Sequence, residues 1–294
     1  MYEILKKVEL AKNIILMEIY APKVTVNCNP GQFVIVRIDE DGERIPLTIC
    51  DYDRKKGTIT IVFQIVGATT MKMAKLNEGD KLKDFVGPLG NESEFVNNKE
   101  ELKDKKIIFI AGGVGTAPVY PQVKWLKENG INSDVIVGAK NKDLVILENE
   151  LNVVAENLYV TTDDGSNGKK GLVTDLLNEL VEKGNHYDLC IAIGPLIMMK
   201  FVCKLTKQLN IPTIVSLNPI MVDGTGMCGA CRVLVDNQVK FACIDGPEFD
   251  GHKVDFDNAI NRAIMYKNEE TRAILKLEEG ETHHGGCGFC GGDK

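Results

Sequence analysis

The sequence predicts an N-terminal antiparallel β-barrel, then an α/β domain built on a parallel sheet, and then a small C-terminal unit rich in cysteine. Short apolar runs separated by turn residues fill residues 1–100, and strands alternate with helices over residues 101–216. Glycine and cysteine concentrate over residues 217–255. Residues 256–294 add a polar helical stretch, expected near residues 258–277, and a tail rich in glycine and cysteine. We therefore expect four consecutive segments with these boundaries.

The barrel is expected because the apolar runs are short, regularly spaced and separated by turn signals such as Asn29-Pro30-Gly31. The runs lie at residues 14–19, 33–38, 58–66 and 81–86. Several short strands at this spacing are typical of a small all-β domain. The stretches RIPLTI (44–49) and IVGATT (65–70) put hydroxyl groups and an arginine at strand ends. Exposed threonines are common on strands, so these two stretches alone predict no ligand.

The α/β domain is expected because the pattern changes near Lys105, where the run KKIIFIAGG is followed by a helical stretch at residues 117–128. The strands SDVIVGA, NLYVTT, DLCIAI and PTIVSL then alternate with helices expected at residues 172–182 and 197–208. These strands are continuous apolar runs. That pattern indicates a parallel sheet that is covered on both faces.

Glycine-rich strand ends in this domain predict a nucleotide site. Glycines after the first strand leave room for a phosphate and direct the amides of the next helix toward it. Two later strand ends, DDGS and IGP, would lie on the same carboxyl edge of the sheet, where ligands of such folds bind. The candidate nucleotide-binding residues are Gly112, Gly113, Val114, Gly115, Thr116, Asp163, Asp164, Gly194 and Pro195.

The strongest chemical signal is the stretch MVDGTGMCGACRVLVDNQVKFAC. Cys228 and Cys231 form a C-x2-C pair, Cys243 follows after eleven residues, and Asp223 stands five residues before Cys228. The plant-type [2Fe–2S] spacing is C-x4-C-x2-C…C, so this pattern places a carboxylate where the first thiolate is expected. Glycines around the pair suit a loop that wraps closely around a cluster. We expect a small iron–sulfur domain with strands at residues 232–235 and 239–242.

Other interpretations of this stretch remain open. Zinc could occupy the same ligands, although zinc knuckles usually present two cysteine or histidine pairs and only one is present here. The three cysteines could also bind no metal. Asp223 could be an ordinary loop residue, with the fourth ligand supplied from elsewhere. If Asp223 does bind iron, its harder oxygen donor should shift the reduction potential of the cluster.

Composition excludes several functional classes. The net charge of −7 argues against a nucleic-acid partner, and no stretch approaches the ~20 apolar residues that cross a bilayer. The N-terminus lacks the pattern of a secretory signal, so we expect a cytoplasmic protein that does not bind membranes. Nine cysteines in such a chain do not predict a disulfide framework. Cys28, Cys50, Cys190 and Cys203 are expected to be small buried side chains.

Together these segments resemble the ferredoxin-reductase-like flavoprotein superfamily, and within it the electron-transfer subunits of the dihydroorotate dehydrogenase type. RIPLTI is similar to the flavin motif of that family, GATT to its pyrophosphate-binding element, GGVGTAP to its nicotinamide-domain glycine turn, and IGPLIMM to its late Gly-Pro motif. The resemblance covers residues 1–277 and implies that the chain binds FAD and NAD(H). The residues that it implies at FAD are Arg44, Pro46, Leu47, Thr48, Val66, Gly67, Thr69 and Thr70.

Asp223 indicates a branch of this family. The dihydroorotate branch has cysteine at the first cluster position, whereas aspartate is similar to the small subunits of NADH-dependent reduced ferredoxin:NADP+ oxidoreductases, bifurcating enzymes also called sulfide dehydrogenases. This resemblance implies an oxidoreductase subunit with Thr48 hydrogen-bonded to flavin N5. It also implies a heterodimer with a larger flavoprotein that has its own FAD and [4Fe–4S] clusters and serves ferredoxin. In plant-type reductases the arginine stands three residues before the flavin-facing hydroxyl, whereas Arg44 stands four before Thr48.

Two other functions remain open at this point. One is the electron-transfer subunit of an NAD-dependent dihydroorotate dehydrogenase, and the other is a redox sensor that holds a cluster without turnover. The choice between NAD and NADP is not decided by the residues. The tail contains His283, His284, Cys287 and Cys290 at metal-compatible spacing, lies outside the resemblance, and is assigned no role.

Overall fold

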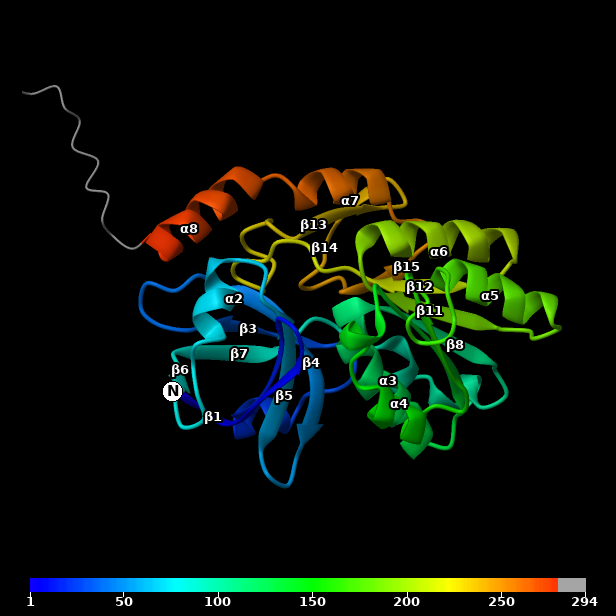
Figure 1. Cartoon of the computed structure of the whole chain (residues 1–294), viewed down its shortest axis with the longest axis horizontal. Helices are drawn as coiled ribbons and strands as arrows, with labels where there is room; N and C mark the ends of the chain where they lie inside the picture. The colour runs from blue at the N-terminus through cyan, green and yellow to red at the C-terminus, as the bar shows by residue number, and fades with distance from the viewer. Residues whose placement is uncertain (280–294) are drawn as a thin grey trace, which may run out of the picture.

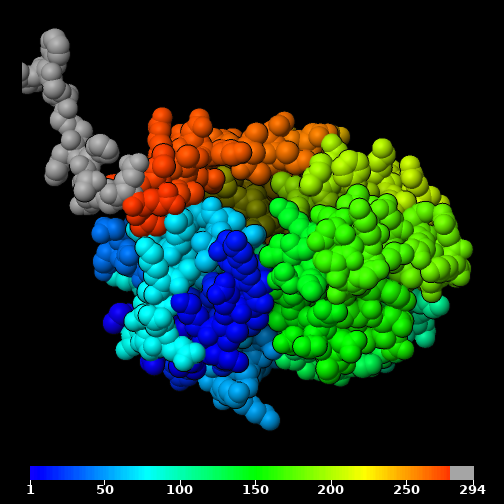
Figure 2. Space-filling model, in the orientation of Figure 1, coloured from blue at the N-terminus to red at the C-terminus, as the bar shows by residue number. Residues whose placement is uncertain are grey.

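The computed structural model describes residues 1–279. Figure 1 shows two bodies side by side, the barrel in blue and cyan and the α/β domain in green. The segment from β13 to α8, in yellow to red, runs along one side of both bodies (Figure 1). The space-filling view shows the same segment in orange above both bodies (Figure 2). The fold class predicted from the sequence is confirmed. The tail residues His283, His284, Cys287 and Cys290 lie outside the described residues.

The barrel is a seven-stranded antiparallel sheet with the order β6-β1-β2-β5-β4-β3-β7. Its outermost strands, β6 and β7, follow each other directly in the chain, so the sheet curls into a nearly closed barrel. The strands are β1 (Tyr2–Ala11), β2 (Ile14–Tyr20), β3 (Phe33–Arg37), β4 (Ile45–Asp53), β5 (Thr58–Gln64), β6 (Lys81–Leu82) and β7 (Asp84–Leu89). The helices of this body are α1 (Pro22–Thr25) and α2 (Ala68–Met73). The short segments η1 (Glu94–Val96) and η2 (Lys99–Leu102) follow β7, and their residues Phe95 and Leu102 pack into the core of the α/β domain.

The interior of the barrel is filled by side chains from alternating positions of its strands. Met17 and Ile19 of β2 and Ile59 and Ile61 of β5 are fully buried, and the intervening side chains point away from this core. β1 was not predicted because its apolar residues are interrupted by lysine and glutamate, which it exposes on its outer face. Exposure does not alternate strictly along β1, because its pairing with β2 shifts register between Ile4 and Lys6 and again between Glu9 and Ala11.

The α/β domain is a six-stranded sheet with the order β10-β9-β8-β11-β12-β15. All six residues of β8 are buried, as its continuous apolar run predicted. The strands are β8 (Ile107–Gly112), β9 (Ser133–Ala139), β10 (Leu158–Thr162), β11 (Leu189–Ile193), β12 (Thr213–Ser216) and β15 (Glu248–Asp250). The helical segments are η3 (Gly113–Gly115), α3 (Thr116–Glu128), η4 (Lys142–Leu144), α4 (Glu148–Val154), α5 (Val173–Glu182) and α6 (Leu196–Gln208).

Two features of this sheet position the site. β8 lies between β9 and β11, so the strand order reverses there and opens a crevice at the carboxyl ends of β8 and β11. The last strand, β15, comes from the cysteine-rich unit and pairs antiparallel with β12. Part of the predicted third domain therefore completes the sheet of the second.

The rest of the C-terminal segment is a two-stranded hairpin, β13 (Arg232–Val235) and β14 (Gln238–Phe241), and two helices. The helical stretch expected near residues 258–277 consists of two helices, α7 (Phe256–Ala263) and α8 (Lys267–Glu279). The chain turns between them, and α8 contacts α2 of the barrel. Among the described residues, no helix combines the length and apolar character needed to span a bilayer.

Candidate functional site

The glycine turns at the ends of β8 and β11 are packed backbone against backbone. A Cβ atom at Gly115 would lie 2.2 Å from the carbonyl oxygen of Ile193 and 2.8 Å from Cα of Gly194. A Cβ at Gly112 would lie 2.9 Å from Cδ of Pro195. No side chain larger than hydrogen fits at these positions. The structure therefore brings the predicted residues of both turns together at the point where the strand order reverses.

Helix α3 begins directly at this turn and fits an anionic ligand. Thr116 is buried, and its hydroxyl donates to the carbonyl of Gly113 at 2.8 Å, which fixes the first turn of the helix. Gly113 has a φ of +55°, a conformation that glycine adopts without strain. Val114 completes the turn as part of η3. The first amides of α3 already donate to the carbonyls of Gly113 and Val114, and Pro118 has no amide hydrogen. The positive end of the dipole of this thirteen-residue helix is therefore what favours an anion here, such as a nucleotide pyrophosphate.

Asp163 and Asp164 lie on the same edge but farther from the crevice. They follow β10, which is separated from β8 by β9. The amide of Asp163 donates to the carbonyl of Ala139 at the end of β9. The hydroxyl and amide of Ser166 donate to the carboxylate of Asp164, and these bonds lower its pKa. Both side chains are exposed, so they are accessible to a ligand that extends along the edge.

The flavin-motif residues lie on β4, opposite β3. Thr48 pairs with Phe33, and Pro46 pairs with Ile35. Thr48 was expected at a strand end but lies inside β4, which continues to Asp53, and Leu47 beside it is half-buried. Phe33, Pro46 and Thr48 line a small cavity whose other wall is formed by residues outside the barrel: Ser216, Leu217, Asn218, Met221 and Pro247. That wall was missed in the sequence because it comes from a segment far along the chain.

The stretch that resembles the pyrophosphate-binding element, GATT, lies in the first turn of α2 and not at a strand end. Gly67 caps the helix, and the hydroxyl of Thr70 accepts hydrogen bonds from the amides of Val66 and Gly67, both at 3.0 Å. The hydroxyl of Thr69 donates to Glu43 at 2.7 Å. Glu43 directly precedes the RIPLTI stretch, so this bond joins the two motifs. Glu43 was not predicted as a site residue.

The cysteine-rich loop brings two predicted ligands into contact. The sulfurs of Cys231 and Cys243 lie 3.2 Å apart, and both side chains are buried. Asp223 accepts hydrogen bonds from the amides of Thr225 at 2.6 Å and Cys228 at 2.8 Å, which lower the pKa of its carboxyl. The thiol of Cys228 is exposed. Burial and the neighbouring Cys231 thiol raise the pKa of Cys243 to about 12, so a metal at this site would have to displace a proton.

The backbone of this loop fits a bound cluster. Gly224 and Gly226 have φ values of +79° and +82°. A Cβ at Gly224 would lie 2.7 Å from Cδ1 of Ile35, and one at Gly226 would lie 2.6 Å from Cδ1 of Ile244. The loop therefore depends on glycine to curve around its cysteines, and three thiols with one carboxylate suit iron. As placed over residues 1–279, however, no three histidine, cysteine or acidic side chains already form an ion site.

Two family models match the chain. The model described as the iron-sulfur cluster binding domain of dihydroorotate dehydrogenase B matches residues 218–255, and the oxidoreductase NAD-binding domain matches residues 109–204. A protein of Thermotoga maritima, the dihydroorotate dehydrogenase B (NAD(+)) electron transfer subunit homolog, is 46% identical over 268 residues, which are 91% of this chain and 92% of that protein. This chain belongs to the family of dihydroorotate dehydrogenase B electron transfer subunits. It is an oxidoreductase subunit with an NAD-binding and an iron–sulfur domain, and an electron transfer subunit implies a catalytic partner subunit.

Two other proteins are similar to this chain over almost its full length. An uncharacterized protein in the adh 3′ region of Clostridium beijerinckii is 63% identical over 297 residues and 100% of both chains. A chain in a solved structure of an NADH-dependent reduced ferredoxin-NADP oxidoreductase, reported for its insights into flavin-based electron bifurcation, is 43% identical. That match covers 95% of this chain and 98% of the other, with a TM-score of 0.87. The predicted resemblance to this family is confirmed.

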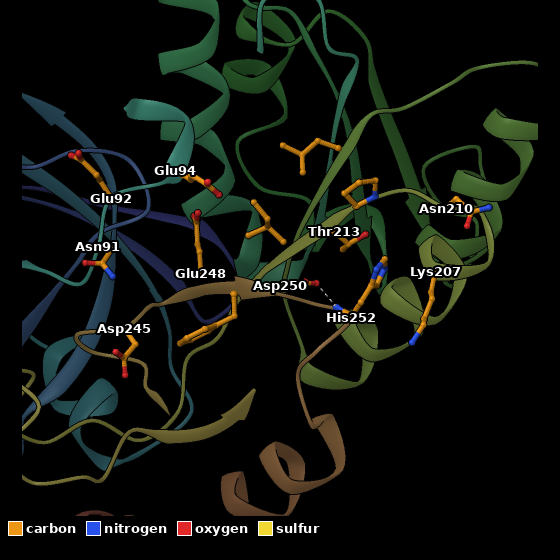
Figure 3. Close-up of a pocket in the computed structure, with 14 residues that line it drawn as sticks. Asn91, Glu92, Glu94, Lys207, Asn210, Thr213, Asp245, Glu248, Asp250 and His252 are labelled. Carbon is orange, nitrogen blue, oxygen red and sulfur yellow. Dashed lines mark hydrogen bonds between the residues drawn. The ribbon is translucent and has the colours of Figure 1, made fainter. Parts of the chain in front are cut away.

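One half-buried carboxylate of this electron transfer subunit was also missed in the sequence. Oε1 of Glu248 accepts hydrogen bonds from the hydroxyl of Ser93 at 2.8 Å and from Nε2 of Gln122 at 2.9 Å. These partners come from the segment after the barrel and from α3, so Glu248 of β15 joins three segments that are far apart in the sequence. Figure 3 shows it extending toward Glu94 in a groove that includes Thr213, at the start of β12. The groove is therefore on the edge opposite the glycine turns. Burial raises the pKa of Glu248 to about 7.

The pKa of Glu248 predicts a pH-dependent stability. Free glutamate ionises near pH 4.5, whereas Glu248 in the folded chain does so near 7, so the wild type should lose stability as pH rises through this interval. Glu248→Gln keeps the acceptor oxygen and removes the titration. We expect the variant to match the wild type near pH 4.5 and to be more stable by up to about 3 kcal/mol at pH 8.

Urea unfolding of both proteins across this pH range measures the difference. Glu94→Gln is the matched control because Glu94 lines the same groove with an exposed side chain. The control keeps Glu248, so its stability should still fall as pH rises, slightly less than in the wild type because the charge of Glu94 contributes to the raised pKa of Glu248. Parallel stability profiles for Glu248→Gln and the wild type would contradict the raised pKa.

Proposed function

We propose that the chain is the FAD- and [2Fe–2S]-containing small subunit of an electron-bifurcating NADH-dependent reduced ferredoxin:NADP+ oxidoreductase. The observation that carries this proposal is the 43% identity and TM-score of 0.87 to a chain of such an enzyme, over almost the full length of both. Asp223 at the first cluster position supports it, since the resemblance assigns an aspartate there to this branch.

Each group of residues has a proposed task in this function. Bound FAD supplies the conversion between hydride transfer and the single electrons that an iron–sulfur cluster carries. Thr48 hydrogen-bonds flavin N5, Pro46 and Leu47 shape the face of β4 beside it, and the turn from Val66 to Thr70 holds the FAD pyrophosphate. The glycine turns of β8 and β11 bind NAD(H), with Asp163 and Asp164 toward its adenosine end. Asp223, Cys228, Cys231 and Cys243 are the cluster ligands.

The proposed partner is a larger flavoprotein with its own FAD and [4Fe–4S] clusters, which exchanges electrons with ferredoxin. Exposed apolar side chains around the cysteine-rich loop support a contact there: Met227 is 87% exposed, Val222 48% and Ile244 46%. Apolar side chains exposed together on a surface are typical of sites that another protein covers. The contact would place the cluster close to the partner.

Identification of the native partner tests this function most simply. Affinity purification of the chain under anaerobic conditions should recover a flavoprotein subunit that contains [4Fe–4S] clusters and oxidises NADPH. The second candidate, a subunit of an NAD-dependent dihydroorotate dehydrogenase, is favoured by the 46% identity to the Thermotoga maritima homolog. Recovery of a dihydroorotate-oxidising subunit would replace the first proposal with the second. A chain with a cluster but no flavin would favour a redox sensor.

Asp223→Cys tests the proposed ligand set. We expect the variant to keep the [2Fe–2S] absorbance with a changed reduction potential, because a thiolate is a softer and more covalent donor than a carboxylate. Asp223→Asn is the companion variant, since it can still accept the amide hydrogen bonds of Thr225 and Cys228 but cannot supply an anionic oxygen; it should lose cluster. An unchanged potential in Asp223→Cys would remove Asp223 from the ligands.

A further inference from the structure

Arg44 links the flavin-motif strand to the cysteine-rich loop. Its Nε donates to the carbonyl of Val222 at 2.7 Å, and its Nη2 approaches the carbonyl of Asp223 at 3.3 Å. The partners are separated from Arg44 by 178 and 179 positions in sequence. A guanidinium group that binds two successive carbonyls fixes both the position and the orientation of the peptide between them. Arg44 immediately precedes β4, which carries Thr48.

The contact holds the part of the loop that leads to the cysteines. Asp223 bonds Arg44 through its backbone, and its side chain accepts the amide of Cys228. Arg44 thus fixes the backbone of Asp223 against the barrel, and the side chain of Asp223 in turn fixes the backbone of Cys228. Because these hydrogen bonds follow one another directly, replacement of Arg44 should change the positions of both Asp223 and Cys228.

Apolar contacts beside Arg44 show that this is where the loop rests on the barrel. Gly224 packs against the side chains of Ile35 and Leu89 so closely that a Cβ would lie 2.7 and 2.8 Å from their methyl carbons. Ile35 also shares a buried cluster with Cys231 and Cys243. These contacts are non-directional, whereas the two hydrogen bonds of Arg44 are directional. Arg44 therefore determines which loop residues lie against the barrel and how their backbone is oriented.

Charge adds to this effect. Three thiolates and a carboxylate around two irons and two sulfides give the cluster a negative charge that increases when it accepts an electron. A guanidinium held against the loop stabilises the reduced form more than the oxidised form. Arg232 and Arg262 also donate to carbonyls of this loop, those of Gly229 and Ala230, but Arg44 is the one that comes from the flavin-motif strand.

We propose that Arg44 is a positioning residue for the cluster loop, which fixes Asp223 and Cys228 relative to the flavin-facing strand and favours reduction of the cluster. The family resemblance implies instead a contact between Arg44 and FAD phosphate. In the structure two of its nitrogens face the loop carbonyls, which directs the side chain toward the loop. This inference rests on the proposed [2Fe–2S] cluster.

The test compares Arg44→Gln and Arg44→Lys with the wild type, all purified anaerobically. FAD, iron and sulfide contents are measured, and the cluster is titrated by EPR during reduction with dithionite. At the wild-type midpoint potential we expect the ratio of reduced to oxidised cluster to fall by about tenfold in Arg44→Gln, with an altered EPR line shape, because one nearby charge is lost. The ratio in Arg44→Lys should lie between those of Arg44→Gln and the wild type, because lysine keeps the positive charge but cannot bind two carbonyls in the fork geometry of arginine.

Arg54→Gln is the matched control. Arg54 also donates to a backbone carbonyl, that of Cys28 at 2.7 Å. It lies just past the opposite end of β4, and a strand that rises 3.3 Å per residue puts it ~30 Å from Arg44. This variant should keep the wild-type ratio and line shape.

The outcomes separate the alternatives. A wild-type cluster ratio and EPR line shape in both Arg44 variants would overturn the proposal, and so would loss of FAD from Arg44→Gln with an unchanged cluster. If Arg44→Gln does not fold, Arg44→Lys decides alone, and an unshifted ratio in it overturns the proposal. A wild-type chain without a cluster would instead overturn the proposed function.

Discussion

Cys231→Ser is expected to leave the purified chain without its iron–sulfur absorbance while it remains folded. Cys231 is 1% exposed, and its sulfur lies 3.2 Å from that of Cys243, so these two thiols are the pair that the structure already brings together. Serine presents a hydroxyl that stays protonated near neutral pH, so it is a much poorer cluster ligand than a thiolate or a carboxylate. We expect bound iron and sulfide to fall by on the order of tenfold or more, since clusters of this type depend on their thiolates. Cys228→Ser should behave in the same way.

The control is Cys28→Ser. Cys28 is also fully buried, and its thiol donates to the carbonyl of Thr25, a bond that a serine hydroxyl can make as well. Iron and sulfide contents, measured beside the absorbance spectrum, should match the wild type in this control. Full iron and sulfide contents in Cys231→Ser would exclude Cys231 from the ligands.

Gly115→Ala is expected to abolish most of the reduction of the bound flavin by NADH. The added methyl group would lie 2.2 Å from the carbonyl oxygen of Ile193, which is backbone and cannot move aside as a side chain could. The turn between β8 and α3 must then move away from the end of β11. A displacement of about 1 Å in a reacting pair can cost on the order of 100-fold in rate, so we expect a loss of that size in stopped-flow measurements with NADH.

Gly130→Ala is the control for a general effect of mutating glycine. Gly130 lies just past the other end of α3, has a φ of +76°, and has open space where a Cβ would go. Its replacement should cost about 1–2 kcal/mol of stability through backbone strain and leave the flavin reduction rate near that of the wild type. Equal rates for Gly115→Ala and the wild type would show that the packed turns do not position the nucleotide.

The elements of the α/β domain were predictable because each of their signals is local. β8 is a continuous apolar run that ends in glycines, and the structure buries all six of its residues. The glycine turn at residues 112–115 was predicted for the same reason, because close backbone packing and a positive φ both require glycine, which is visible in the sequence. Pairing of β15 with β12 was not predicted, because a strand of three residues has too little pattern to be recognised.

The parts of the site that were missed depend on contacts between distant residues. Glu43 meets Thr69 from 26 positions away, and Glu248 meets Ser93 from 155 positions away. Nothing in the local composition around these residues distinguishes them from ordinary surface glutamates. Arg44 was selected by its motif, but its partners in the cysteine-rich loop could be identified only once the loop was seen against the barrel. Sequence patterns thus identified the chemistry, and the fold supplied the connections between its parts.

We propose that one chain combines a nucleotide site, a flavin and a [2Fe–2S] cluster in electronic contact. Anaerobic titration of the isolated chain with NADH, followed by visible absorbance and EPR after measurement of its flavin, iron and acid-labile sulfide, tests this directly. We predict one FAD with two irons and two sulfides per chain, flavin absorbance that bleaches with NADH, and an EPR signal of the reduced cluster that appears in the same titration. Protein expressed with adequate iron that contains neither iron nor acid-labile sulfide would contradict the claim.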